Sequence, residues 1–276
     1  MESDRGPVRF GVVTPVLNGE EFLRQTLESI WTQASDDVRI DHVLVDGGST
    51  DRTLKIAADF PTRVLRSEDD QGMYDAVNKG MAEVDGAIVG YINADDEIAP
   101  GAVAAIVDAF RREPKAGWLC GRVEYTGPNG EVLGRMQPVR VSLASYAGIG
   151  WSTIPQQTVW ARREFFDAIG PFDLAYRNCG DYDWYARALL RHHPLIVQQT
   201  LGRFRLHPAQ ISLDPATMER ESHMVQDRYG GTGRLRWLQG KLLSLRLNAR
   251  NPAWLVAKKR GRISFTADPG QRDHGA

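Results

Sequence analysis

Two adjacent carboxylates, Asp95 and Asp96, follow an apolar run at residues 86–92 that is typical of a buried strand. A helical pattern begins just after them, at residues 99–101, so the acids occupy the carboxyl end of a strand. Open α/β sheets bind their ligands at this end. Neighbouring carboxylates repel each other without a cation, and a hard divalent metal that also contacts phosphate oxygens is the usual partner. The pair therefore predicts chemistry on a nucleotide-linked substrate.

Polar residues also end two earlier strands. Thr14 and Pro15 lie at the end of a predicted strand at residues 9–16, and Asp46 follows a second at residues 40–45. Asp46 could accept the N–H of a nucleobase, while the glycines that follow it would let a ligand approach the backbone closely. A turn with a helix cap accounts for the same residues. Both interpretations of Asp46 stay open at this point.

A second acidic loop spans residues 67–76. It contains Asp70, and Asn78 and Lys79 follow it on a predicted helix. Favourable charge at a helix N-terminus explains one acid of this loop well and four acids poorly.

Two later residues are candidates on chemical grounds. Asp181 begins a predicted helix at residues 181–192, and from spacing alone a helix cap is its simplest role. If it faces the same crevice, it could act as the general base for a hydroxyl nucleophile. His207 lies in a loop just before Pro208, where it is either exposed or a metal ligand.

The elements that position these residues form an α/β pattern. Strands alternate with helices over about the first hundred residues, which predicts a mostly parallel sheet with right-handed crossovers and helices on both faces. The later half is mixed and contains a predicted hairpin at residues 118–136. We expect one domain at residues 1–212, with a nucleotide-binding half at 1–112 and an acceptor-side half at 113–212. A helical tail follows at residues 213–276.

Composition excludes several classes. The 276 residues are 42% hydrophobic and 25% charged, as in a soluble globular protein, and a net charge of −1 gives no case for nucleic-acid binding. Two cysteines do not make a disulfide framework, which favours a reducing, cytoplasmic location. No glycine-rich fingerprint follows the first strand and no P-loop motif occurs, which argues against dinucleotide and P-loop proteins.

The C-terminal region has a different character. Residues 228–267 contain ten Lys or Arg and no acid, with leucines and tryptophans interleaved. A basic amphipathic helix of this kind can lie on an anionic membrane surface, here the inner face of the cell membrane. A terminal helix docked on its own domain with a solvated basic face explains the pattern equally well.

Six motifs in order resemble family 2 glycosyltransferases with the GT-A fold. They lie at residues 14–18, 45–51, 70–80, 93–96, 170–173 and 181–184, and the resemblance covers residues 9–212. It implies an inverting transfer from a nucleotide-diphosphate sugar to an acceptor hydroxyl. UDP is the expected nucleotide, with dTDP and GDP as alternatives. The acceptor would be a glycan or a lipid-linked precursor of a surface polysaccharide or glycolipid.

The resemblance also implies roles for individual residues. Asp181 would be the catalytic base, and Asp96 with His207 would hold Mn²⁺ or Mg²⁺. Asp95 would contact the ribose or the sugar. The remaining donor-binding set comprises Thr14, Pro15, Asn18, Asp46, Asp70, Asn78, Lys79 and Asn93. Two positions depart from the family pattern, since Asn93 replaces an acid of some relatives and Gly180 replaces the Glu that often precedes the base.

Two other functions compete with this one. A nucleotidyltransferase shares the acidic α/β site, but residues 14–25 offer only Arg24 where that class favours a basic, glycine-rich loop. A non-catalytic nucleotide-sugar-binding protein is the second alternative. The presence of both Asp96 and Asp181 argues against it.

Overall fold

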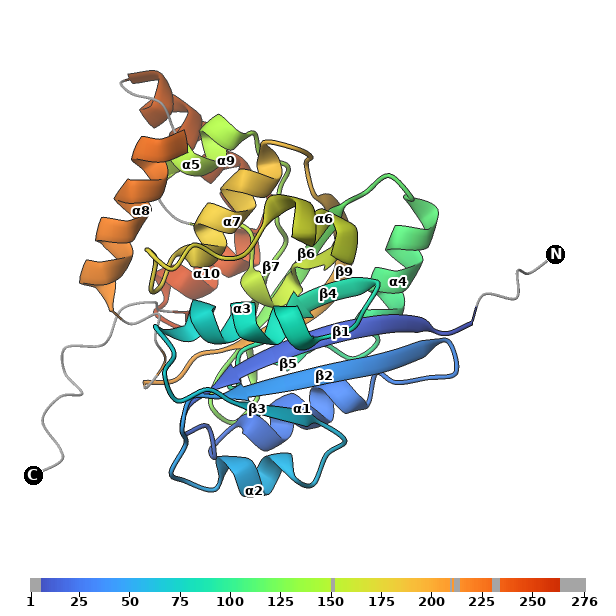
Figure 1. The fold of residues 1–276 in the computed structure, drawn as a ribbon. Helices are drawn as coiled ribbons and strands as arrows, with labels where there is room; N and C mark the ends of the chain where they lie inside the picture. The colour runs from blue at the N-terminus through green and yellow to red at the C-terminus, as the bar shows by residue number, and fades with distance from the viewer. Residues whose placement is uncertain (1–5, 150–151, 209, 211–213, 230–233, 264–276) are drawn as a thin grey trace, which may run out of the picture.

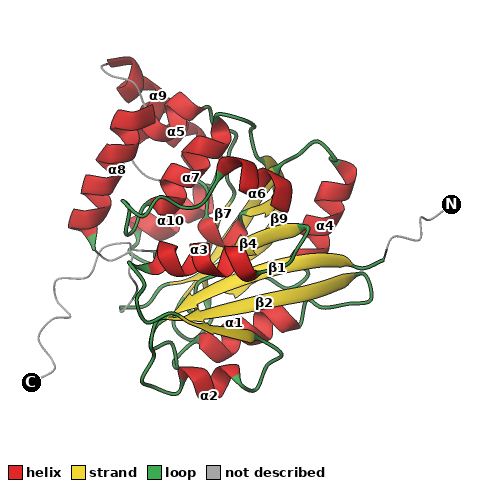
Figure 2. Ribbon diagram, in the orientation of Figure 1, coloured by secondary structure: helices red, strands yellow, loops and turns green. Residues whose placement is uncertain are grey.

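The computed structural model describes residues 6–149, 152–208, 210, 214–229 and 234–263. One sheet runs through this part of the chain, and helices cover both of its faces (Figure 1, Figure 2). Nine strands join it, in the order β3-β2-β1-β4-β8-β6-β9-β5, with β7 paired to β6.

The first part of the sheet is fully parallel. It consists of β1 (Val8–Val16), β2 (Val38–Asp46), β3 (Arg63–Arg66) and β4 (Ile88–Tyr91). β1 lies between β2 and β4, and Val16 at the end of β1 pairs with Asp46 at the end of β2. The carboxyl ends of these strands therefore meet at one edge, as the alternating pattern predicts.

The second part of the sheet is mixed. β8 runs antiparallel to both β4 and β6, and β9 runs parallel to β6 but antiparallel to β5. The predicted hairpin is present, since β7 pairs antiparallel with β6. The bounds are β5 (Glu97–Ile98), β6 (Trp118–Thr126), β7 (Val132–Met136), β8 (Trp160–Arg162) and β9 (Leu195–Arg205).

Each face of the sheet has its own core. α1 (Leu23–Trp31) and α4 (Ala102–Arg112) pack with β1 residues such as Phe10 on one face. α3 (Met73–Glu83), α6 (Arg163–Ile169) and α7 (Gly180–Leu189) pack with Val13 and Val45 on the other. Strand segments covered on both sides read as continuous apolar runs, and this explains the runs at residues 10–13 of β1, 43–45 of β2 and 88–91 of β4.

The sequence patterns overestimate helix length and miss short elements. The sequence predicts helices at residues 20–33 and 52–59, and in the structure they span only Leu23–Trp31 and Thr53–Ala57 (α2). The seven-residue helices α5 (Leu143–Ile149) and α6 were not predicted, nor was the two-residue strand β5. Elements this short contain too few turns for an apolar period to be recognised.

The tail forms three helices that pack on the domain. They are α8 (Pro215–Tyr229), α9 (Arg234–Arg250) and α10 (Pro252–Lys259). α9 contacts α5 and buries Leu243 and Leu247, whereas α10 contacts β7 and buries Trp254. Pro252 at the first position of α10 separates it from α9. No helix within the described residues is long and apolar enough to cross a lipid bilayer.

A tight contact between α3 and the sheet gives a test of this packing. A Cβ added at Gly80 would lie 2.4 Å from Val13 Cγ1 and 2.9 Å from Val45 Cγ2. Helix propensity alone predicts that Gly80→Ala stabilises the protein by about 1 kcal/mol. We expect instead a net loss of about 1–3 kcal/mol, because α3 must move away from a close-packed sheet. Urea unfolding measures the change, and a variant more stable than the parent would contradict the described contact.

Candidate active site

Three loops meet at the carboxyl edge of the parallel strands. The loop after β1 contains Asn18, which adopts a left-handed backbone conformation with φ of 51°. Its backbone N–H donates to Ser49 Oγ at 2.8 Å, and its Oδ1 accepts the N–H of Thr50 at 2.9 Å. Asn18 thus joins the loop after β1 to the loop after β2. A Cβ added at Gly19 would lie 3.4 Å from Ala94 Cβ, which places the loop after β4 alongside.

Asp46 lies at the centre of this edge and is fully buried. Its carboxylate accepts the backbone N–H groups of Gly48 at 3.3 Å and Ser49 at 3.2 Å. Arg66 Nε, at the end of β3, is 3.9 Å from it. The turn after β2 is therefore organised around the Asp46 carboxylate.

Thr14 faces away from this edge. Its hydroxyl is buried 2.9 Å from His42 Nε2, and Pro15 beside it is also buried. Burial lowers the pKa of His42 to about 3, so the imidazole is neutral and takes part in the hydrogen bond to Thr14. Thr14 would therefore meet a ligand only through its backbone.

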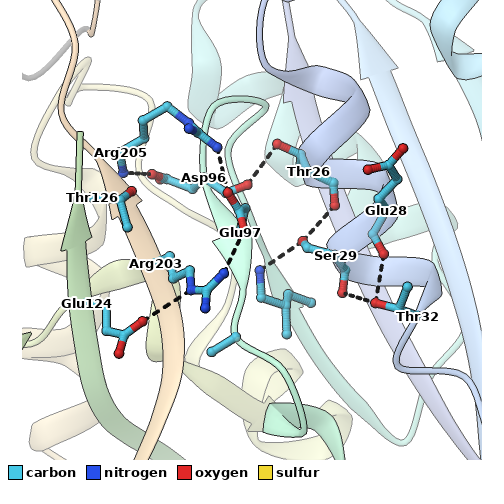
Figure 3. A network of polar contacts seen from close by, with 12 residues as sticks. Thr26, Glu28, Ser29, Thr32, Asp96, Glu97, Glu124, Thr126, Arg203 and Arg205 are labelled. Carbon is cyan, nitrogen blue, oxygen red and sulfur yellow. Dashed lines mark hydrogen bonds and ion pairs between the residues drawn. The ribbon is translucent and has the colours of Figure 1, made fainter. Parts of the chain in front are cut away.

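Asp96 is buried and all its contacts are internal. Oδ1 accepts the backbone N–H of Arg205 at 3.0 Å, and Oδ2 accepts the amide of Gln157 at 2.8 Å. Its backbone carbonyl oxygen accepts the Thr26 hydroxyl at 2.7 Å (Figure 3). Burial first, and then the neighbouring Asp95 carboxylate, raise the pKa of Asp96 well above its usual value.

Asp95 and His207 form a more accessible pair. His207 Nε2 lies 2.9 Å from Asp95 Oδ2, although the two residues are far apart in the sequence. Asp95 is partly exposed, whereas the His207 ring packs at a tilt against Phe22, with a centroid distance of 4.8 Å. Arg205, at the end of β9, holds the strand in place by donating to the Asp95 carbonyl oxygen at 3.0 Å.

The donor set for a cation at this position is small. Within the described residues, no group of three or more His, Cys, Asp or Glu side chains could hold a metal ion. Asp95 supplies a carboxylate oxygen, the donor type that suits Mg²⁺ and Mn²⁺, and His207 Nε2 lies 2.9 Å from it. Asn93 Oδ1 is buried close by without a hydrogen-bond donor among the described residues, and its amide is 3.4 Å from Asp96 Oδ2.

The predicted acidic loop is held by a lysine. Lys79 Nζ lies 2.6 Å from Asp70 Oδ1 and 3.2 Å from Asp75 Oδ2. The other oxygen of Asp70 is buried without a partner in the described part of the chain. Asn78 has a different role, because its side chain both donates to and accepts from the backbone of Phe172 at 2.9 Å. Asn78 therefore fixes the loop that precedes α7.

Asp181 is half-buried at the first turn of α7. Its Oδ1 accepts a hydrogen bond from the backbone N–H of the next residue, Tyr182, at 2.7 Å, and lies 3.3 Å from the Tyr74 hydroxyl. Burial raises the pKa of Asp181 to about 6, and these hydrogen bonds oppose the rise. Burial raises the pKa of Tyr91, and the charges of the Asp181 and Asp96 carboxylates raise it further. Both acids are therefore close enough to Tyr91 to interact with it electrostatically. A base with this pKa next to the acidic edge is suited to take a proton from a hydroxyl.

Several residues that build the site had no separate sequence signal. Tyr74 lies inside the motif at residues 70–80, but its contact with Asp181 spans more than a hundred residues. Gln157 and Arg205 belong to no motif, and their roles depend on β9 lying beside the loop after β4. Glu221 of α8 accepts backbone N–H groups just before α7, which no local pattern indicates.

Known proteins resemble this chain in sequence. The sequence profile described as "Glycosyl transferase family 2" matches residues 11–187. A "PGL/p-HBAD biosynthesis glycosyltransferase" from Mycobacterium bovis (strain BCG / Pasteur 1173P2) is 33% identical over 206 residues, covering 71% of this chain and 77% of the relative.

Solved structures share the fold. S. aureus TarS in complex with UDP-GlcNAc has a TM-score of 0.64 and 17% identity, covering 89% of this chain and 74% of that one. The mannosyltransferase PcManGT from Pyrobaculum calidifontis, in complex with GDP-Man and Mn²⁺, has a TM-score of 0.58 and 16% identity, covering 92% and 74%. The chain has the GT-A fold of these neighbours, and because the profile covers most of the sheet and α7, it belongs to glycosyltransferase family 2.

Proposed function

We propose that this glycosyltransferase moves a sugar from a nucleotide-diphosphate donor to an acceptor hydroxyl with inversion at the anomeric carbon. The observation that carries the proposal is Asp181, half-buried with a pKa of about 6, close to the loop that ends in Asp95 and Asp96. Inversion needs one base on the side opposite the leaving diphosphate, and Asp181 would be that base. The Tyr74 hydroxyl near Oδ1 would keep its carboxylate oriented.

The loops after β1 and β2 would hold the nucleoside. Support comes from their mutual hydrogen bonds through Asn18, which give a fixed surface before any ligand binds. Asp46 would act chiefly by shaping the turn at Gly48, because its oxygens already accept two N–H groups. The unpartnered oxygen of Asp70 is available to accept a hydrogen bond from the donor, while Lys79 would hold that carboxylate.

A divalent cation, Mn²⁺ or Mg²⁺, would be held by Asp95 and His207, with the diphosphate completing its shell. This revises the assignment of the metal to Asp96, whose two oxygens are buried and engaged by Arg205 and Gln157. Asp96 would instead fix the shape of the loop that presents Asp95. When bound, the cation would stabilise the charge that develops on the departing diphosphate.

The acceptor and the nucleotide are narrower proposals. The mycobacterial relative is named for PGL/p-HBAD biosynthesis, which supports a glycolipid or surface-polysaccharide precursor with a free hydroxyl. Neighbouring structures hold UDP-GlcNAc and GDP-Man, so UDP remains the first choice and GDP the second. A thermal-shift panel of UDP-, GDP- and dTDP-sugars, with and without Mn²⁺, shows which nucleotide the donor carries, because a bound donor raises the melting temperature.

Peripheral contact with a membrane is supported by the outer face of α9. On this helix Gly240, Leu243 and Leu247 are buried, while Trp237 and Leu245 are 63% and 65% exposed. Leu238 and Leu242 share the exposed side. Four large apolar side chains in one stripe are costly in water and suit the boundary between lipid head groups and acyl chains.

Cations surround this stripe. Lys241 lies over the Trp237 ring at 5.6 Å, and Arg246 is exposed one turn further along α9. A surface hollow of about 360 Å³ opens beside Leu242 and is lined by Arg140 and Arg246, neither of which pairs with an acid among the described residues. Positive charge around an apolar stripe favours an anionic lipid surface over a nucleic acid or an acidic protein. The hollow would take one phosphate-bearing head group.

The role of Asp181 predicts a pH dependence. A base must be deprotonated, so kcat/KM should rise as pH increases through about 6 and then level off. Asp181→Asn should lower turnover by about 10²- to 10⁴-fold while donor binding persists. Release of nucleoside diphosphate measures turnover, and the exposed Asp167→Asn on α6 is the control. Full activity in Asp181→Asn, or a rate that falls with rising pH, would contradict the assignment.

The cation site predicts loss of activity in EDTA and recovery with Mn²⁺ or Mg²⁺. Calorimetry with UDP present should show that Asp95→Asn and His207→Ala weaken Mn²⁺ binding by about tenfold or more, because each removes one of two protein ligands. Asp69→Asn in the exposed acidic loop is the control and should bind Mn²⁺ normally. Activity that survives thorough chelation would rule out the cation.

The membrane surface predicts binding to anionic vesicles. The intact protein should sediment with phosphatidylcholine vesicles that contain phosphatidylglycerol and less with pure phosphatidylcholine. Trp237→Ser with Leu245→Ser, or Arg140→Gln with Arg246→Gln, should weaken this binding by about tenfold or more. Val64→Ser on the edge strand β3 is the control for an exposed apolar residue. Unchanged sedimentation of both double variants would refute the surface, as would equal binding to both vesicle types.

A further inference from the structure

Helix α8 contacts the backbone just before the proposed base. Glu221 is 1% exposed, and three consecutive N–H groups donate to its carboxylate. The N–H of Arg177 lies 3.0 Å from Oε1, and those of Asn178 and Cys179 lie 2.8 Å and 2.9 Å from Oε2. Figure 1 shows α8 alongside α7, although α8 lies outside the residues that the family profile matches.

This contact is strong for physical reasons. Hydrogen bonds from N–H groups to an ionised carboxylate are roughly twice as strong as those between neutral groups. The three donors precede α7, and the last of them, Cys179, is its N-cap residue. The positive end of the α7 dipole lies close to this turn and attracts an anion. A buried carboxylate that met fewer donors would be costly, so Glu221 and the turn at 177–179 hold each other in one geometry.

The same turn contacts the Asp181 carboxylate through Tyr74. The carbonyl oxygen of Asn178 lies 3.2 Å from the Tyr74 hydroxyl, and the Asp181 N–H donates to that hydroxyl at 3.1 Å. The turn is therefore held from α8 through its N–H groups and from α3 through its carbonyl group. Asp181 lies two residues beyond the last of the three N–H donors.

A second contact fixes α8 against α7 one turn further on. Asp183 is fully buried, and its Oδ1 accepts the Tyr229 hydroxyl at 3.0 Å. Its Oδ2 accepts Arg187 Nε at 2.8 Å. With α8 attached at both Glu221 and Tyr229, it cannot shift along α7 without breaking one of the two contacts.

We infer that Glu221 is a positioning residue for the transfer reaction: it sets the direction in which α7 presents the Asp181 carboxylate. The inference rests on the proposed role of Asp181 as the base. Among the described residues, the Glu221 carboxylate has hydrogen bonds to the turn before α7 and none to the loops after β1 and β2, so it would affect the catalytic step and leave donor binding intact.

The test compares Glu221→Gln with Glu219→Gln. Both change a carboxylate to an amide on α8, but Glu219 is exposed. The amide that replaces the Glu221 carboxylate cannot accept from all three N–H groups, so we expect kcat to fall by about ten- to a hundredfold with the KM for donor unchanged. Glu219→Gln should behave as the parent. Thermal unfolding of each variant shows how much of the chain stays folded, and Glu221→Asp, which keeps the charge, should recover part of the rate.

A double variant separates positioning from general loss of structure. If Glu221 acts through Asp181, Glu221→Gln should lower the residual rate of Asp181→Asn much less than it lowers the parent rate. An equal loss in both backgrounds, or a folded Glu221→Gln with parental kcat, would overturn the inference. Full activity of Asp181→Asn alone would instead overturn the proposed function. If Glu221→Gln does not fold, a folded Glu221→Asp with raised donor KM and parental kcat overturns the inference as well.

Discussion

Buried carboxylates that accept backbone N–H groups hold this enzyme's active edge in shape. Asp46 organises the turn after β2, Asp96 joins the loop after β4 to the end of β9, and Glu221 fixes the turn before α7. Each is almost completely removed from water. A buried carboxylate without donors is strongly unfavourable, so each of these loops has one well-defined conformation in which the acid is satisfied. The groups proposed to react, Asp95 and Asp181, lie on or next to these fixed turns.

The proposed division between acids that support the loops and acids that react follows from the exposure of their side chains. Asp95 and Asp181 keep part of their surface open, whereas Asp46 and Asp96 are fully buried. Asp95 meets His207, and Asp181 has a raised pKa because it is half-buried beside aromatic side chains. Adjacent residues in one motif can thus have different functions. In the proposed site, Asp96 would shape the loop, and Asp95, whose side chain is partly exposed, would be the group that meets a ligand.

Much of the edge could be predicted from sequence because it depends on chain order. Parallel strands separated by single helices bring their carboxyl ends together, so residues such as Asp46 and Asp95 had to lie near one another. In a strand buried on both faces, the sequence does not show which face a side chain points to. Thr14 was expected at the ligand site, but its hydroxyl contacts His42. The contact of Glu221 with residues 177–179 depends on how α8 packs against α7. The charged residues of α8 are spaced like those of any exposed helix, so the sequence does not predict that Glu221 is buried. The predicted parallel α/β half and the mixed second half were both confirmed.

The position of α8 also bears on how this enzyme could be recombined with its relatives. The family profile ends at residue 187, before the segment that carries Glu221 and Tyr229. A chimera that exchanged only the profiled segment would join one protein's α7 to another protein's α8. Its two buried acids, Glu221 and Asp183, would then face foreign partners. A chimera should therefore cross over after residue 229, so that α7 and α8 come from the same protein.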